Sequence, residues 1–183
     1  MSRIRSAWLA SLLCAALFVS PAFAQSPKAD KPVSPPAFSG RTPGPFVLIE
    51  TERGTLTVEL FPEVAPKTIA QFLNLAKKGF YNGSSFYRVV PKFLIQAGDP
   101  SGSGTGGSGR TIPDEFNEKK HKTGTVGMAH TKDPDSGDSQ FYICLEPQPF
   151  LDGKYTVFGQ VVEGLDVLPK IQEGDVIRKV SLR

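Results

Sequence analysis

The chain has 183 residues, of which 39% are apolar and 21% charged, and its formal net charge at neutral pH is +3. This length suits one domain with short appendages, and the composition excludes a wholly disordered chain or a coiled coil. Two cysteines are too few for a disulfide scaffold, and a charge of +3 is too weak to indicate a nucleic-acid-binding protein.

The first 24 residues have the pattern of a cleavable export signal. Arg3 and Arg5 give a basic start, residues 7–19 form an apolar run, and residues 22–24 (Ala-Phe-Ala) fit a small-x-small cleavage site. The apolar run is too short to span a ~30 Å hydrocarbon core comfortably, which argues against a membrane anchor. We therefore expect a mature chain that begins at Gln25, lies in the periplasm or outside the cell, and has no stable membrane insertion.

Residues 25–45 are predicted to form an extended, disordered tether. They hold six prolines together with Ser, Lys and Asp, so they cannot bury enough apolar surface to fold. A proline-rich ligand for a partner protein is the alternative. The folded domain is expected to cover residues 46–183.

Alternation of apolar and polar residues, typical of strands, dominates this domain. Residues 46–52 and 55–61 are predicted to form a hairpin around residues 53–54 (Arg-Gly). Further strands are predicted at residues 85–90, 93–97, 125–131, 140–145, 156–162 and 176–182.

One helix is predicted to begin at Pro66 and to end at Gly79, with its apolar residues on one face. A second, shorter helix is predicted between Leu165 and Gln172, although Pro169 weakens it. About eight strands and one or two helices favour an antiparallel barrel with helices at its ends over a parallel α/β fold.

Several other patterns are discounted. Residues 104–109 match the glycine spacing of a dinucleotide site, but no apolar helix follows, so a flexible surface loop is expected. His121, His130 and Cys144 do not have metal-ligand spacing, so no metal site is predicted. Cys144 lies in the middle of a predicted strand, where a buried and inert thiol is the usual outcome.

Arg88 and Gln96 are polar residues within apolar strands. A charge in such a run is costly unless it reaches solvent, a partner or a substrate. The pattern alone favours an arginine paired with a carboxylate at the rim of the barrel. However, a turn at residues 91–92 would place Arg88 beside Gln96, and two polar groups among phenylalanines indicate a site that binds a carbonyl and an apolar ring.

Residues 86–99 (Phe-Tyr-Arg-Val-Val-Pro-Lys-Phe-Leu-Ile-Gln-Ala-Gly-Asp) resemble the central signature of the cyclophilins, which are peptidyl-prolyl cis-trans isomerases. Shorter matching strings follow the family order and extend the resemblance over nearly all of residues 46–183: 65–68 (Ala-Pro-Lys-Thr), 127–129 (Gly-Met-Ala), 139–143 (Ser-Gln-Phe-Tyr-Ile), 151–154 (Leu-Asp-Gly-Lys) and 157–159 (Val-Phe-Gly). The resemblance, closest to bacterial exported members, implies a closed eight-stranded antiparallel barrel capped by two α-helices. It also implies a substrate site on the outer face.

The family reaction is rotation about an X-Pro amide, whose barrier is ~18–20 kcal/mol. Rotation needs no nucleophile, metal or cofactor. The resemblance implies that Arg88 donates a hydrogen bond to the prolyl nitrogen and stabilises the twisted amide, while Gln96 binds the substrate backbone. It assigns the apolar proline pocket and its rim to Phe93, Leu94, Tyr142, Phe150, Leu151 and Tyr155, and pairing with an extended peptide to the backbone of Ala129 and His130.

Three positions depart from the best-studied eukaryotic members. Phe150 replaces a tryptophan, which predicts weak binding of cyclosporin; Tyr155 replaces a histidine and His130 an asparagine. The expected function is isomerisation of proline-containing, extended polypeptides by a monomer that assists the folding of exported proteins. A proline-binding module or holding chaperone is the alternative.

Overall fold

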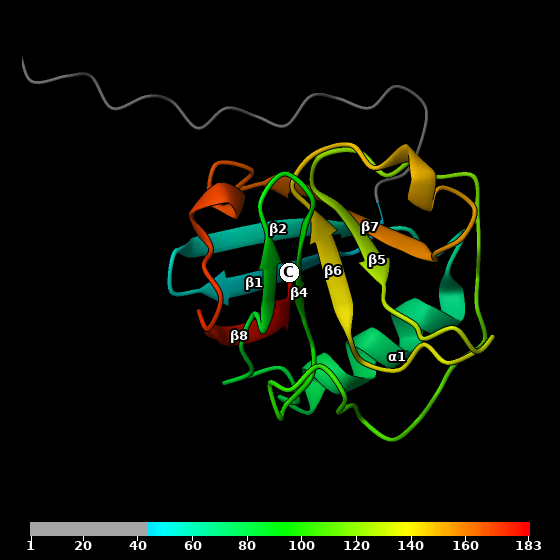
Figure 1. Cartoon of the computed structure of the whole chain (residues 1–183). Helices are drawn as coiled ribbons and strands as arrows, with labels where there is room; N and C mark the ends of the chain where they lie inside the picture. Colours follow the sequence, from blue (N-terminus) through cyan, green and yellow to red (C-terminus); the bar gives the residue numbers. More distant parts are fainter. Residues whose placement is uncertain (1–43) are drawn as a thin grey trace, which may run out of the picture. The chain divides into compact units, whose positions relative to one another are not determined.

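The computed structural model describes residues 44–183, so the predicted export signal and most of the predicted tether lie outside the described residues. Eight strands form one antiparallel sheet in the order β3-β4-β6-β5-β7-β2-β1-β8 (Figure 1). The strands are β1 (Phe46–Thr51), β2 (Gly54–Leu60), β3 (Arg88–Val90), β4 (Leu94–Ala97), β5 (Thr125–Met128), β6 (Phe141–Cys144), β7 (Val157–Glu163) and β8 (Ile177–Leu182). Within residues 44–183, no helix is long and apolar enough to cross a membrane.

The first predicted helix is confirmed as α1 (Pro66–Lys77). Pro66 occupies its first turn, where a missing N–H costs nothing. After the C-cap residue Lys78, Gly79 adopts a φ of 70°, a conformation that ends helices and favours glycine. Ile69 and Phe72 are buried on the apolar face of α1 and belong to the main core.

The second predicted helix is replaced by a single short turn. Only η2 (Leu168–Lys170), a 3-10 helix, forms in this region, and Ile171 already has an extended backbone. Pro169 has no N–H to donate and its ring obstructs the preceding turn, so a longer α-helix cannot pass through it. The helices of the described domain are therefore α1, η2 and another 3-10 helix, η1 (Pro149–Leu151).

The sheet is curled but open, which corrects the expectation of a closed barrel. β3 and β8 are its two edges, and no strand ladder joins them within residues 44–183. The segments that precede these strands meet at one bridge, between Ser85 and Val176. Gly83 and Gly174 flank this bridge with φ values of 82° and 90°. Backbone N–H groups of Gly83, Ile177, Phe86 and Gly174 also donate across these segments, to the carbonyl oxygens of Ile177, Ser84, Asp175 and Phe86, but these bonds do not form a strand ladder.

Aromatic side chains fill the concave side of the sheet. The Phe72 ring lies 5.0 Å from Tyr81, 5.5 Å from Phe141 and 5.3 Å from Phe158, measured between ring centres. All four side chains are buried in the main core. The interior of the sheet is therefore packed with side chains.

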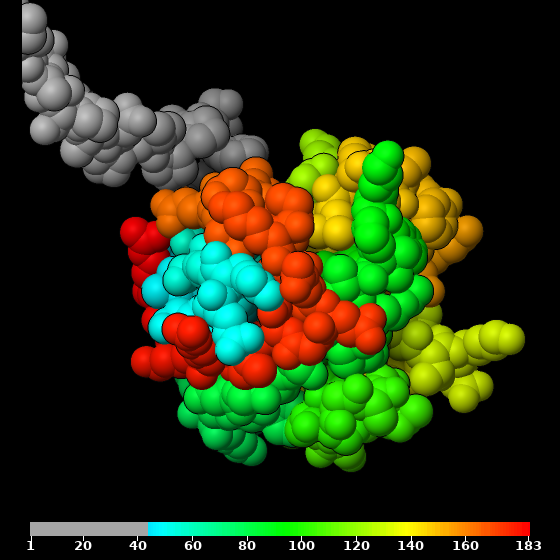
Figure 2. Space-filling view, turned by 60° about the vertical axis from the view of Figure 1, so that its left-hand side comes forward, coloured from blue at the N-terminus to red at the C-terminus, as the bar shows by residue number. Residues whose placement is uncertain are grey.

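The C-terminal segment is fastened to the first hairpin. Figure 2 shows residues 46–60 beside the segment that leads from η2 to β8. Arg53, in the β1–β2 turn, donates two hydrogen bonds to the carboxylate of Asp175, at 2.7 and 2.9 Å. The hydrogen bond from Arg53 outweighs burial and holds the pKa of the Asp175 carboxyl below its usual range.

Candidate active site on the outer face of the sheet

The strand register places Arg88, Gln96 and Tyr142 in one row. Arg88 on β3 pairs with Gln96 on β4, which pairs with Tyr142 on β6, which pairs with Gly127 on β5. Side chains in register point to the same face of a sheet. The adjacent row points into the main core and consists of Val89, Ile95, Ile143 and Val126.

Arg88 has an amide partner. Its Nη1 donates to Oε1 of Gln96 at 3.2 Å, and its guanidinium lies 5.8 Å from the centre of the Phe93 ring. The side chain is exposed, and within residues 44–183 it forms no salt bridge with a carboxylate. The structure thus removes the alternative of a rim ion pair and leaves guanidinium N–H groups available on the outer face.

Gln140 is a site residue that the sequence analysis did not identify. Its Oε1 accepts hydrogen bonds from Nε2 of Gln96, at 3.2 Å, and from the hydroxyl of Tyr87. Its Nε2 donates to the carbonyl oxygens of Gly104, at 3.1 Å, and Gly106, at 2.7 Å. Burial raises the pKa of Tyr87 to about 12, so its hydroxyl keeps its proton. Gln140 lies within the family-matching string 139–143, and that string is the sequence signal that could have pointed to this role.

The glycine-rich loop is held by carboxylates, whereas the sequence predicts a flexible loop. Asp99 is fully buried and accepts hydrogen bonds from the backbone N–H groups of Ser101, Gly104 and Gly106, at 2.7, 2.7 and 3.1 Å. Burial opposes ionisation of Asp99, but these bonds and the Ser101 hydroxyl hold its pKa below the usual range. Asp138 accepts further backbone N–H groups of the loop. The carbonyl groups that bind the Gln140 side chain are therefore fixed in place.

A second apolar cluster, here named the outer cluster, lies on the same face as Arg88. It consists of Leu94, Tyr142, Cys144 and Leu151, with Phe93, Ala129 and Tyr155 packed against it. Phe150 extends it, because its ring stacks on Phe93 with the centres 5.8 Å apart, and it is 57% exposed. The sheet separates this cluster from the main core, so its apolar surface can meet a ligand from outside.

Cys144 lies at the base of the outer cluster. It is fully buried, as predicted, and burial raises the pKa of its thiol to about 12. A thiol with so high a pKa is a poor nucleophile at neutral pH, so the structure gives Cys144 a packing role.

The predicted peptide-pairing residues, Ala129 and His130, lie at the edge of the outer cluster. The His130 ring is 4.4 Å from the Tyr155 ring, between centres. β5 ends at Met128, earlier than predicted, although the Ala129 N–H continues the pairing with the chain before β6 by donating to the carbonyl oxygen of Gln140 at 2.9 Å. That N–H is therefore already bonded within the protein and does not remain for pairing with a peptide. All ten predicted site residues nevertheless lie together on one face.

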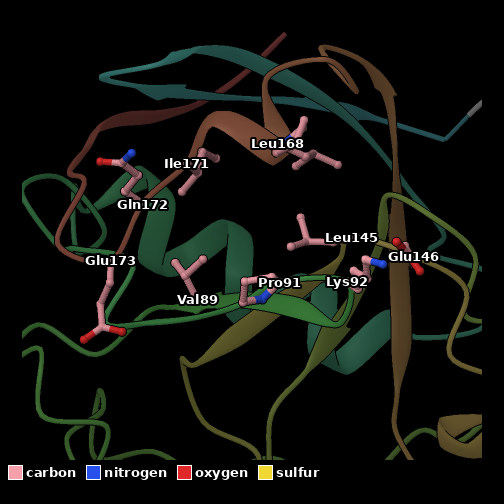
Figure 3. A pocket seen from close by; sticks show the side chains of 10 residues that line it. Val89, Pro91, Lys92, Leu145, Glu146, Leu168, Ile171, Gln172 and Glu173 are labelled. Atoms are coloured by element: carbon pink, nitrogen blue, oxygen red, sulfur yellow. The ribbon is translucent and has the colours of Figure 1, made fainter.

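A groove of about 470 Å³ lies on the other side of the β3–β4 turn, beneath η2 (Figure 3). Val89 and Leu145 line it on one side and Leu168 of η2 on the other, and Lys92 and Glu146 are also among its lining residues. None of the ten predicted site residues lines it. The groove is therefore separate from the outer cluster.

Comparison with known proteins identifies the family. Residues 46–182 match the model of the cyclophilin type peptidyl-prolyl cis-trans isomerases. A peptidyl-prolyl cis-trans isomerase from Synechococcus elongatus is 47% identical over 137 residues, which cover 74% of this chain and 94% of the relative. Peptidyl-prolyl cis-trans isomerase B from Bacillus subtilis is 49% identical over 139 residues, covering 75% and 96%.

The fold agrees with this match. A crystal structure of a Cryptosporidium parvum cyclophilin type peptidyl-prolyl cis-trans isomerase in the presence of the dipeptide Ala-Pro has a TM-score of 0.71 and 32% identity, covering 75% of this chain and 98% of that one. The chain belongs to the cyclophilin family. By its class it is a peptidyl-prolyl cis-trans isomerase.

Proposed function

We propose that Arg88 carries out the isomerisation by donating a hydrogen bond to the prolyl nitrogen. Resonance of the nitrogen lone pair gives the amide its barrier of ~18–20 kcal/mol. A donor aimed at this nitrogen withdraws the lone pair, so it stabilises the twisted amide more than either planar form. The observation that carries the proposal is an exposed guanidinium beside Phe93 and the outer cluster, with no carboxylate partner among residues 44–183.

The hydrogen-bond chain behind Arg88 supports its role, because a donor fixed in advance needs no reorganisation in the transition state. Gln96 holds Arg88, Gln140 holds Gln96, and the loop organised by Asp99 holds Gln140. One N–H of the Gln96 amide binds Gln140, and the second remains for the substrate backbone.

The outer cluster supplies the surface for the proline ring. Its apolar side chains pack together and include Phe93, Leu94, Tyr142 and Leu151. Phe93 lies beside Arg88. A relative of known structure was crystallised with the dipeptide Ala-Pro. We therefore infer that the ligand is an extended polypeptide whose proline ring rests on this cluster.

Exchange NMR on an Ala-Pro peptide tests the mechanism. The wild type is expected to accelerate cis-trans exchange, and Arg88→Ala to lower the acceleration by about 100-fold, as for loss of a fixed transition-state donor. Arg88→Lys keeps the charge but loses the planar fork, and is expected to lose about tenfold. Arg178→Ala, at an exposed position on β8, is the matched control and should be as active as the wild type. An Arg88→Ala variant as fast as the wild type would refute the role of Arg88.

We further propose that the physiological substrates are exported proteins and that the mature enzyme works in the periplasm. The basic start, apolar run and Ala-Phe-Ala site of residues 1–24 support this proposal. Fractionation of a bacterial expression host, followed by mass spectrometry, should find a periplasmic protein that begins at Gln25. Recovery of the full-length chain from the cytoplasm would contradict it.

A further inference from the structure

A buried histidine lies directly behind the outer cluster. His121 is 2% exposed. Its Nδ1 lies 2.9 Å from Oδ1 of Asp152, and its Nε2 lies 2.9 Å from the hydroxyl oxygen of Tyr142. Asp152 Oδ1 also accepts the backbone N–H of His121 at 2.9 Å. A continuous chain thus runs from a carboxylate through an imidazole to a phenol of the outer cluster.

The ionised carboxylate of Asp152 sets the direction of one of these hydrogen bonds, and the state of the ring sets the other. An ionised carboxylate only accepts, so Nδ1 of the imidazole donates to Asp152, and in the neutral ring Nε2 is left as an acceptor. With a neutral ring, Tyr142 donates its hydroxyl proton to His121. Burial raises the pKa of Tyr142, while hydrogen bonds from the backbone and ring of His121 hold the pKa of Asp152 below its usual range, in agreement with this assignment.

Gly127 gives independent support, because it makes room for the Tyr142 phenol. It is the cross-strand partner of Tyr142. A Cβ at position 127 would lie 2.3 Å from both Cζ and the hydroxyl oxygen of Tyr142. The phenol thus lies directly over the backbone of Gly127, and any side chain there would displace it.

We propose that His121, held by Asp152, is a positioning residue that fixes Tyr142 as a wall of the proline-binding surface. The inference rests on the proposed function of the outer cluster. Because the hydroxyl is hydrogen-bonded to His121 inside the protein, Tyr142 presents the apolar surface of its ring to the substrate. Tyr155 packs edge-on against this ring, with the centres 5.9 Å apart. A displaced Tyr142 would therefore disturb the position of Tyr155 as well.

The test compares Tyr142→Phe, His121→Phe and the double variant by NMR titration and exchange with an Ala-Pro peptide. Each single variant is expected to raise the peptide Kd about fivefold, the worth of one buried hydrogen bond. The double variant is expected to lose no more than the larger single loss, because both changes break the same bond. His121→Gln retains an acceptor near Nε2 and should recover part of the affinity.

Tyr81→Phe is the matched control, since its buried hydroxyl donates to the carbonyl oxygen of Ser139, at 3.3 Å, within the main core. It should lower the melting temperature and leave the peptide Kd unchanged. Gly127→Ala should raise the Kd by displacing Tyr142, which keeps the inference testable if His121→Phe fails to fold.

Unchanged Kd values in folded Tyr142→Phe and Gly127→Ala would overturn the inference, as would independent losses that add in the double variant. The failure of the proposed function looks different. In that case the wild type itself would not accelerate exchange, while the effects on the peptide Kd would still report on Tyr142.

Discussion

An exposed guanidinium and a carboxamide on adjacent strands dominate the chemistry of the outer face. A carboxylate in place of Gln96 would neutralise Arg88 and compete with a substrate for its N–H groups. The amide oxygen instead orients Arg88 at 3.2 Å and leaves its positive charge intact. This choice of partner fits a proposed catalytic donor better than a structural ion pair.

Phe150 permits a test of ligand specificity at the scale of one residue. It stacks on Phe93 but has no hydrogen-bond donor. We expect the wild type to bind cyclosporin weakly, and Phe150→Trp to bind it about fivefold more tightly because an indole N–H is added. Isothermal titration calorimetry would measure both affinities, with Leu165→Trp, at another exposed position, as the control. Nanomolar binding by the wild type would show this view of Phe150 to be wrong.

At the scale of the element, α1 is stabilised at its start by a residue that is distant in sequence. Its N-cap residue, Ala65, makes no side-chain capping bond. Glu115 replaces this cap, because its carboxylate accepts the backbone N–H groups of Lys67, at 3.0 Å, and Thr68, at 2.8 Å. The negative charge also suits the positive end of the helix dipole.

Glu115→Ala is therefore expected to lower the free energy of unfolding by about 1 kcal/mol, the usual cost of losing a helix cap. Urea denaturation followed by circular dichroism would measure this loss. Glu118→Ala removes an exposed carboxylate of the same segment and should change stability much less. Equal effects of the two variants would argue against capping by Glu115.

At the scale of the whole molecule, two carboxylates join segments that are far apart in sequence, and a third organises a loop close to it in the chain. The Asp175 carboxylate accepts a hydrogen bond from the Arg53 guanidinium, and the Asp152 carboxylate accepts one from the backbone of His121. Asp99 organises the glycine-rich loop. The pKa of each of these carboxyl groups is held below its usual range. Each group therefore stabilises the folded chain only while it is ionised.

This arrangement predicts loss of stability in acid. The carboxyl pKa is about 3.9 in the unfolded chain and lower in the folded one, so the stabilisation is complete above this value and is lost as the pH falls below it. Thermal unfolding between pH 6 and 3 should show the melting temperature falling below about pH 4.

Asp175→Asn should be less stable than the wild type at pH 6 and should lose less stability on acidification. Asp133→Asn, at an exposed position, should follow the wild-type curve. If the Asp175→Asn curve runs parallel to the wild type at all pH values, Asp175 makes no such contribution.

The sequence by itself located the strands and the first helix, and it gave a set of candidate site residues. Alternating apolar residues located all eight strands, Pro66 and Gly79 marked the ends of α1, and the resemblance named residues that the fold brings to one face. These features are local, because strand period, helix ends and short motifs are written in neighbouring residues.

Only the tertiary structure decided how the edges of the sheet meet and which hydrogen bonds hold the side chains of the site. Within residues 44–183, β3 and β8 are left as the edges of the sheet, and the segments before them, far apart in sequence, meet at the Ser85–Val176 bridge and through irregular backbone hydrogen bonds. Gln140 and His121 gain their roles only when folding brings Gln96, Tyr142 and Asp152 to them. A hydrogen bond between distant residues leaves no periodic signal in the sequence, and for that reason these supports became visible only in the folded chain.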